Sequence, residues 1–153
     1  MILSHRSWTI CLKTFPQRRL SPVPSAPAAA AQTAPPGRQV SAGRAALHFW
    51  EEPCISGTRG SGTVFFSGCT LKCCFCQNYP ISAEGLGKEI TIEHLAEIFL
   101  DLQKQGAHNI NLVTPGQWRP WIIAALDIAR AEGLRLPIVC NTGGYETVES
   151  VEA

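Results

Sequence analysis

Short apolar runs alternate with helical patterns over residues 63–140, and this alternation constrains the fold more than any other feature. Three runs read as short buried strands: residues 63–67 (TVFFS), 109–113 (NINLV) and 138–140 (IVC). Thr91, as a predicted N-cap, and Pro120, in a predicted first turn, each open a stretch with apolar residues at helical spacing, and these stretches predict two amphipathic helices. The order of strands and helices predicts an α/β fold of consecutive βαβ units with parallel strands.

The composition fits one folded domain. The 153 residues are 45% hydrophobic and 16% charged, with a formal net charge of +1. This balance supplies a hydrophobic core and excludes a strongly basic nucleic-acid-binding chain. The sequence contains no apolar run of about twenty residues, so we expect no membrane span. Neither nucleic acid nor a membrane is an expected partner.

The N-terminal part differs from the rest of the chain. Residues 1–50 contain six Lys and Arg and no acidic residue, whereas all twelve Asp and Glu lie in 51–153. Residues 22–36 (PVPSAPAAAAQTAPP) are of low complexity and have little apolar surface to bury. We therefore predict a disordered basic tail over 1–44 and a folded domain over 45–153. We expect a cytoplasmic location. The acid-free N-terminus is also typical of an organelle transit peptide, so import into an organelle is the alternative.

The cysteines are clustered. Four of the seven lie within residues 69–76, and Cys69, Cys73 and Cys76 have the spacing C-x3-C-x2-C. An odd, clustered set argues for a reducing compartment and metal chemistry rather than a disulfide framework. Thiolates are soft ligands that suit iron–sulfur clusters, zinc or Cu(I). Three thiolates on a four-iron cluster leave one iron open, whereas structural zinc would need a fourth ligand from Cys54 or Cys74.

The order of the predicted strands places the clustered cysteines where a ligand is expected. In parallel sheets, ligands collect at the carboxyl ends of the strands. Cys69, Thr114 and Asn141 each lie at the end of a predicted strand or directly after it. We therefore expect these three residues to lie at one edge of the sheet.

The stretch HFWEEPCISGTRGSGTVFFSGCTLKCCFCQNYPIS, beginning at His48, resembles the radical S-adenosylmethionine (SAM) superfamily. Together with the later NLVTP and NTGGYE segments, it is most similar to the pyruvate formate-lyase activating enzyme-like branch. The resemblance runs from about Ala45 to the last residue. It implies that residues 45–153 form the N-terminal half of a radical SAM core domain, a partial (β/α) barrel truncated after about three strands.

The resemblance also implies a cofactor set. Cys69, Cys73 and Cys76 would hold a [4Fe–4S] cluster whose open iron binds SAM. The residues that would contact SAM are Phe75 beside the adenine, Thr114, Pro115 and Gly116 at the methionine end, and Asn141 and Thr142 near the ribose. From the residues alone, Phe75 could instead cover the core and the segment after Asn141 could be only a turn. Relatives more often have Thr-His after the Thr-Pro, whereas this chain has Gly116-Gln117.

The activity implied by the resemblance is reductive cleavage of SAM to methionine and a 5′-deoxyadenosyl radical. In activating enzymes this radical takes a hydrogen atom from a glycine of a partner protein. The implied partners are therefore a glycyl radical enzyme as substrate and a low-potential electron donor such as flavodoxin or ferredoxin. No catalytic side chain is assigned beyond the cluster ligands. The alternatives are a zinc-binding interaction module and an inactive fragment.

Overall fold

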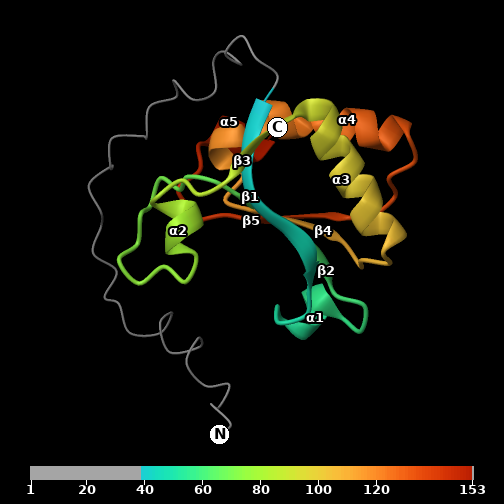
Figure 1. Cartoon of the computed structure of the whole chain (residues 1–153), viewed down its shortest axis with the longest axis horizontal. Helices are drawn as coiled ribbons and strands as arrows, with labels where there is room; N and C mark the ends of the chain where they lie inside the picture. Colours follow the sequence, from blue (N-terminus) through green and yellow to red (C-terminus); the bar gives the residue numbers. More distant parts are fainter. Residues whose placement is uncertain (1–38, 153) are drawn as a thin grey trace, which may run out of the picture.

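The computed structural model describes residues 39–152, which form a five-stranded sheet with helices against it (Figure 1). The strands are β1 (Gln39–His48), β2 (Ser61–Phe66), β3 (Lys88–Thr91), β4 (Ile110–Val113) and β5 (Ile138–Asn141). The helices are α1 (Pro53–Ser56), α2 (Tyr79–Ser82), α3 (Ile92–Lys104), α4 (Arg119–Ala131) and α5 (Val148–Glu152), with a 3₁₀ turn η2 (Gly116–Trp118) before α4. Within these residues, no helix has the length and apolar character needed to cross a bilayer.

The three predicted strands are confirmed and lie side by side. β4 pairs in parallel with β2 on one side and with β5 on the other, with Val64 opposite Leu112 and Leu112 opposite Cys140. The carboxyl ends of β2, β4 and β5 therefore meet at one edge of the sheet. This is the arrangement that the alternation of strands and helices predicts.

The predicted partial (β/α) barrel is wrong. The sheet is open and mixed, with the strand order β3-β1-β2-β4-β5. β1 pairs antiparallel with both β2 and β3, so β2 is the central strand of an open sheet and not the first strand of a parallel barrel. β1 was not predicted, because its residues QVSAGRAALH include several Ala and a Gly, which are poor strand formers.

The predicted boundary between tail and domain, at residues 44 and 45, falls inside β1. The strand begins at Gln39, and the domain predicted over 45–153 begins with the last four residues of this strand. The rest of the predicted tail, residues 1–38, lies outside the described residues.

α3 and α4 pack against each other and against one face of the sheet. Phe99 and Leu95 of α3 and Ala125 of α4 are completely buried in one core with Val64 and Ile110 of the sheet. Burial of apolar side chains is the main driving force for this packing. The core thus fixes the positions of β2 and β4, whose ends carry the predicted site.

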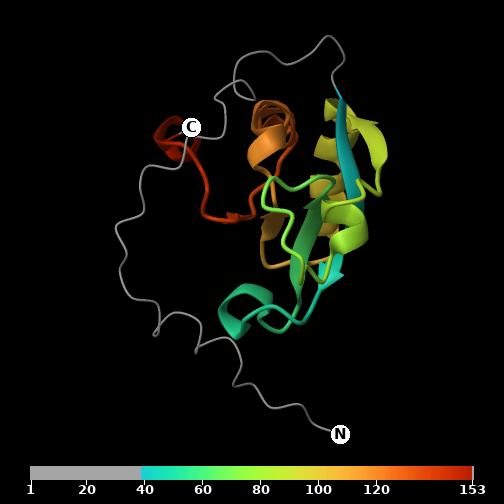
Figure 2. The same cartoon turned by 90° about the vertical axis from the view of Figure 1, so that its left-hand side faces the viewer.

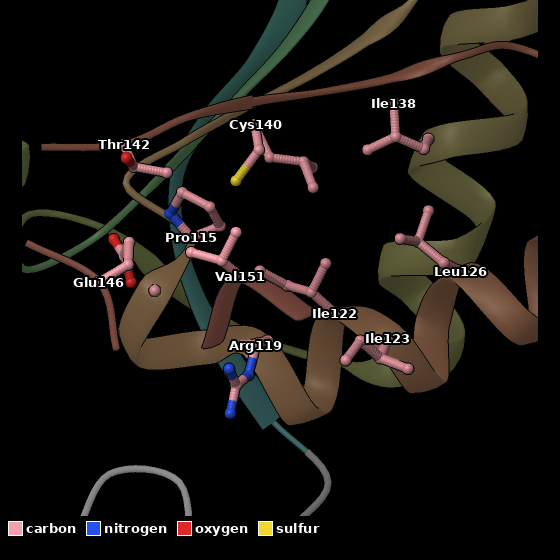
Figure 3. Close-up of a pocket in the computed structure, with 12 residues that line it drawn as sticks. Pro115, Arg119, Ile122, Ile123, Leu126, Ile138, Cys140, Thr142, Glu146 and Val151 are labelled. Carbon is pink, nitrogen blue, oxygen red and sulfur yellow. The ribbon is translucent and has the colours of Figure 1, made fainter. Parts of the chain in front are cut away.

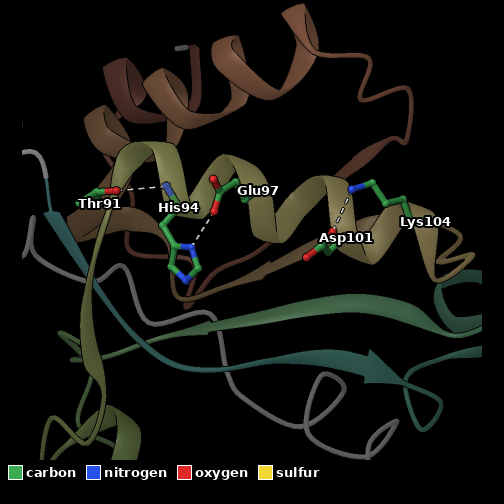
Figure 4. A network of polar contacts seen from close by, with 5 residues as sticks. All are labelled: Thr91, His94, Glu97, Asp101 and Lys104. Carbon is green, nitrogen blue, oxygen red and sulfur yellow. Dashed lines mark hydrogen bonds and ion pairs between the residues drawn. The ribbon is translucent and has the colours of Figure 1, made fainter.

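The N-terminus of α3 has the predicted cap. The Thr91 hydroxyl accepts a hydrogen bond from the backbone N–H of His94 at 3.1 Å (Figure 4). On the exposed side of the helix, His94 contacts Glu97 at 2.9 Å and Lys104 contacts Asp101 at 3.1 Å. The cap satisfies one free backbone donor of the first turn, whereas the exposed pairs contribute little to stability.

α1 and α5 lie at opposite ends of the sheet in both views (Figures 1 and 2). α1 belongs to the amino-terminal ends of the parallel strands, where Asn109 donates from Nδ2 to the carbonyl of Ile55 at 2.7 Å. The Ser61 hydroxyl donates to Asn109 Oδ1 at 2.6 Å, and both side chains are buried. This end of the sheet therefore contains buried polar side chains that are hydrogen-bonded to one another and to the backbone of α1.

Candidate functional site

The residues at the carboxyl ends of the parallel strands are joined by hydrogen bonds. The backbone N–H of Thr114 donates to the carbonyl of Asn141 at 2.9 Å, and the Thr114 hydroxyl donates to the carbonyl of Phe66 at 3.3 Å. Thr114 therefore connects the ends of all three parallel strands. The expectation that Cys69, Thr114 and Asn141 lie at one edge of the sheet is confirmed.

The cysteine loop, residues 68–78, leaves this edge and returns to it through α2. The backbone N–H of Gly68 donates to the carbonyl of Ile81 at 2.9 Å, and that of Cys69 donates to the carbonyl of Ser82 at 2.8 Å. Gly68 has φ of 79°, a conformation that glycine adopts without steric cost. The two ends of the loop are thus held together while its middle projects from the sheet.

Three cysteines of the loop are partly shielded from solvent. Cys69, Cys73 and Cys76 are half-buried, whereas Cys74 and every other residue from 70 to 80 is exposed. The backbone N–H of Cys76 donates to the carbonyl of Cys73 at 3.1 Å and forms a turn between these two cysteines. The burial pattern separates the three cysteines of the C-x3-C-x2-C spacing from their neighbour Cys74.

The sulfur of Cys76 has a polar partner. The Ser82 hydroxyl donates to Cys76 Sγ at 3.2 Å, and the side chain of Ser82 is nearly buried. None of the cysteines in residues 39–152 forms a disulfide. The donor set therefore consists of free thiols in one loop, as iron–sulfur chemistry requires.

In residues 39–152, no three side chains of His, Cys, Asp or Glu are gathered closely enough to hold a metal ion. The chemistry and spacing of the three cysteines fit an iron–sulfur cluster, whereas their sulfurs stand apart in this conformation. Metal binding commonly orders its own ligands, because a complete ligand set is seldom formed without the metal.

Cys54 does not belong to the cysteine loop. It lies on α1, at the amino-terminal end of β2, whereas Cys69 follows the carboxyl end of that strand. Six residues of strand span about 20 Å, so the two sulfurs cannot share one metal ion. A zinc site completed by Cys54 is excluded by this separation. Cys11 lies outside the described residues.

Two non-glycine residues in the described part of the chain have positive φ, and both lie at this edge of the sheet. Lys72, between Cys69 and Cys73, has φ of 44°, and Thr114 has φ of 53°. The left-handed conformation costs about 1–2 kcal/mol for a residue with a Cβ atom. Strain of this kind tends to concentrate at functional sites, so its location agrees with the position of the predicted ligands.

Gln117 and Trp118 contact the segment between β2 and Cys69, and no sequence pattern predicted this role. Gln117 Nε2 donates to the carbonyls of Ser67, at 3.2 Å, and of Gly68. Trp118 Nε1 donates to the carbonyl of Ser67 at 3.0 Å. These bonds satisfy carbonyls that β2 leaves free at its end and fix the start of the cysteine loop against η2.

Phe75 is 83% exposed, next to Cys76. The alternative in which this ring covers the core is wrong. A large exposed apolar ring beside the cysteines leaves one face available for a flat ligand group. The predicted contact with adenine stays a prediction.

The loops after β4 and β5 border a cavity of about 410 Å³ (Figure 3). Pro115, Gly116 and Thr142 line it, together with apolar side chains of α4 and Val151 of α5. Cys140 also lines the cavity, where burial, and in second place the charge of Glu146, raises the pKa of its thiol. A Cβ atom on Gly116 would lie 2.8 Å from a carboxylate oxygen of Glu146, so only glycine fits without a shift.

The cysteine loop also meets the loop after β5. A Cβ atom on Gly143 would collide with the side chain of Leu71, which lies between Cys69 and Cys73. Glycine at this position permits the close approach. The loops after β2, β4 and β5, which contain the predicted cluster and SAM residues, therefore form one continuous surface.

Comparison with known proteins gives a family match and one curated relative. The family described as 4Fe-4S single cluster domain matches residues 56–143, which include the whole cysteine loop and the ends of β4 and β5. "Uncharacterized protein MJ0674" of Methanocaldococcus jannaschii is 31% identical over 112 residues, which are 69% of this chain and 32% of the relative. The chain thus spans about a third of the length of this relative. No solved structure matches the chain.

Proposed function

The chain belongs to the family of 4Fe-4S single cluster domains and is an iron–sulfur protein, and we propose that it is of the radical SAM type. In this proposal Cys69, Cys73 and Cys76 are the three protein ligands of a [4Fe–4S] cluster. The observation that carries the assignment is the burial pattern of the cysteine loop, in which these three cysteines are half-buried and Cys74 is exposed.

Three thiolates leave one iron of a four-iron cluster without a protein ligand. A closed electron-transfer cluster uses four cysteines, whereas this loop supplies three half-buried ones. Cys54 is at the other end of β2, and Cys74 is exposed. The ligand count therefore favours a cluster that binds a further molecule at its open iron.

We assign SAM to this open position. When bound and reduced, the cluster would supply the one electron needed for reductive cleavage of the sulfonium of SAM. Phe75 would stack on the adenine, for which its exposed ring is available. The remaining contacts are assigned to Thr114, Pro115 and Gly116 after β4 and to Asn141 and Thr142 after β5.

The role of these loops is to hold SAM in place. Thr114 is bonded to the ends of both neighbouring parallel strands, so it transmits the positions of β2 and β5 to the loop that would bind the methionine end. A fixed orientation of the reacting groups accounts for much of the rate enhancement by an enzyme. The strained backbone at Thr114 is consistent with a loop shaped for a ligand.

An activating-enzyme role is the finer proposal. It rests on the resemblance of the His48 stretch, NLVTP and NTGGYE to the pyruvate formate-lyase activating enzyme-like branch. In that role the substrate is a glycine of a glycyl radical enzyme, and the electron donor is a flavodoxin or ferredoxin.

Cluster binding is tested by anaerobic reconstitution with iron and sulfide, followed by iron analysis and visible absorption. The wild-type chain should become brown and bind four irons per chain. Cys73→Ala should lose the colour, whereas Cys74→Ala, the adjacent control, should retain it. Equal iron content in both variants, or zinc as the bound metal of the wild-type protein, would contradict the proposal.

SAM chemistry is tested on the reconstituted protein. Reduction with dithionite in the presence of SAM should release 5′-deoxyadenosine, and Phe75→Ala should raise the SAM concentration needed for half-maximal release. A chain that holds the cluster and neither binds nor cleaves SAM would remove the radical SAM assignment and leave the iron–sulfur assignment intact.

A further inference from the structure

We propose that Ser82 is a positioning residue that sets the reduction potential of the cluster through a hydrogen bond to Cys76. This inference rests on the proposed assignment of Cys69, Cys73 and Cys76 as cluster ligands. It concerns a residue outside the cysteine spacing, six positions after the last cysteine of the loop.

Ser82 contacts two of the three proposed ligands. Its carbonyl accepts from the backbone N–H of Cys69 at 2.8 Å, and its hydroxyl donates to Cys76 Sγ at 3.2 Å. The side chain is on the last residue of α2, and the residue is 7% exposed. Ser82 therefore links the first cysteine of the loop to the last.

The surroundings hold Ser82 in this position. Its backbone N–H donates to the carbonyl of Asn78 at 2.8 Å, within the turn of α2. The preceding carbonyl, of Ile81, accepts from the N–H of Gly68. The hydroxyl is thus carried by a backbone that is hydrogen-bonded both to the end of β2 and within the turn of α2.

A hydrogen bond to a ligand sulfur affects the two redox states unequally. When the cluster takes one electron, its sulfurs become more negative, so a donor stabilises the reduced state more than the oxidised state. Because Ser82 is shielded from solvent, water does not readily replace its hydroxyl after removal. The structure therefore predicts that loss of this hydroxyl makes the cluster harder to reduce.

The experiment is a redox titration of the reconstituted chain, followed by electron paramagnetic resonance of the reduced cluster. Ser82→Ala should shift the one-electron equilibrium against reduction by about tenfold, which corresponds to a fall in midpoint potential of about 59 mV. Ser82→Thr keeps a hydroxyl and should restore most of the wild-type potential. Ser67→Ala removes an equally buried hydroxyl that donates to the carbonyl of Leu86, and it should leave the potential unchanged.

The outcomes separate the two proposals. A wild-type chain that binds no iron–sulfur cluster refutes the proposed function itself. A wild-type chain that holds the cluster, with the same potential in Ser82→Ala and Ser67→Ala, refutes only the role of Ser82. If Ser82→Ala fails to retain the cluster, retention by Ser82→Thr supports the hydroxyl as the cause, and loss in both variants overturns the inference.

Discussion

The two ends of the parallel strands are built differently. At the amino-terminal end, Ser61 and Asn109 are buried and bonded to each other, and Asn109 is bonded to the carbonyl of Ile55. At the carboxyl end, the cysteine loop is largely exposed, and Lys72 and Thr114 have strained backbones. One end thus consists of buried, hydrogen-bonded polar side chains, whereas the other carries an exposed loop and a strained backbone.

The difference shows how one sheet can combine a stable end with an exposed end that carries the proposed ligands. A buried polar network with satisfied hydrogen bonds fixes a unique arrangement of the chain. Loops at the opposite end of the sheet can then be exposed and strained without loss of the fold. We therefore expect changes at the amino-terminal end to affect stability alone, and changes at the carboxyl end to affect iron binding as well.

The largest effect on stability is expected from Asn109→Ala. The change removes two side-chain hydrogen bonds and leaves the Ser61 hydroxyl and the Ile55 carbonyl without their partner. Each buried polar group left unsatisfied costs about 1–3 kcal/mol. Chemical denaturation should report this loss, while the iron content after reconstitution at low temperature stays at the wild-type value. A large loss of iron in a folded variant would remove the distinction between the two ends.

Gln117→Ala is the corresponding change at the carboxyl end. It removes the donor to the carbonyls of Ser67 and Gly68 and should lower the free energy of unfolding by about 1 kcal/mol. Because these bonds fix the start of the cysteine loop, iron incorporation should also become slower. Gln117→Glu should reduce stability and iron incorporation more than Gln117→Ala does, because a carboxylate that faces two carbonyls cannot donate a hydrogen bond. Normal iron incorporation in both variants would show that η2 does not position the loop.

Lys72→Gly tests the strain in the cysteine loop. Glycine relieves the left-handed conformation at φ of 44° but increases the entropy of the unfolded chain, so the stability should change by less than about 1 kcal/mol. Ala96→Gly, in the buried middle of α3, is the control and should be clearly destabilising. A similar loss of stability in both variants would mean that Lys72 carries no strain in solution.

The smallest effect is expected from Glu146→Gln at the cavity beside β5. Glu146 contributes to the raised pKa of Cys140, so its neutralisation should lower that pKa and increase the thiolate fraction at neutral pH. Burial is the larger cause and persists, so the rate of alkylation of Cys140 should rise by less than about tenfold. Mass spectrometry after timed alkylation would measure it. If the alkylation rate of Cys140 depends on pH in the same way in Glu146→Gln and in the wild-type protein, Glu146 does not affect the pKa of Cys140.

Sequence patterns predicted the parallel half of the sheet and the helices on it. The helical spacing after Thr91, its cap and the strands at 110–113 and 138–141 all appear in the structure. These elements have long or strongly apolar patterns, which depend on local spacing alone. β1 and β3 escaped prediction because one is rich in Ala and the other has four residues, and only pairing with β2 and with each other makes them strands.

The C-x3-C-x2-C spacing can be read from the amino-acid sequence, and the order of predicted strands and helices places the cysteines at the carboxyl end of a strand. The three-dimensional structure was needed to show that the sheet is open and mixed, that Cys54 lies at the far end of β2, and that Ser82 and Gln117 contact the cysteine loop. The reason is physical: spacing along the chain sets which side chains a short loop can gather. Pairing of distant strands, and hydrogen bonds between segments far apart in sequence, arise only when the whole core packs.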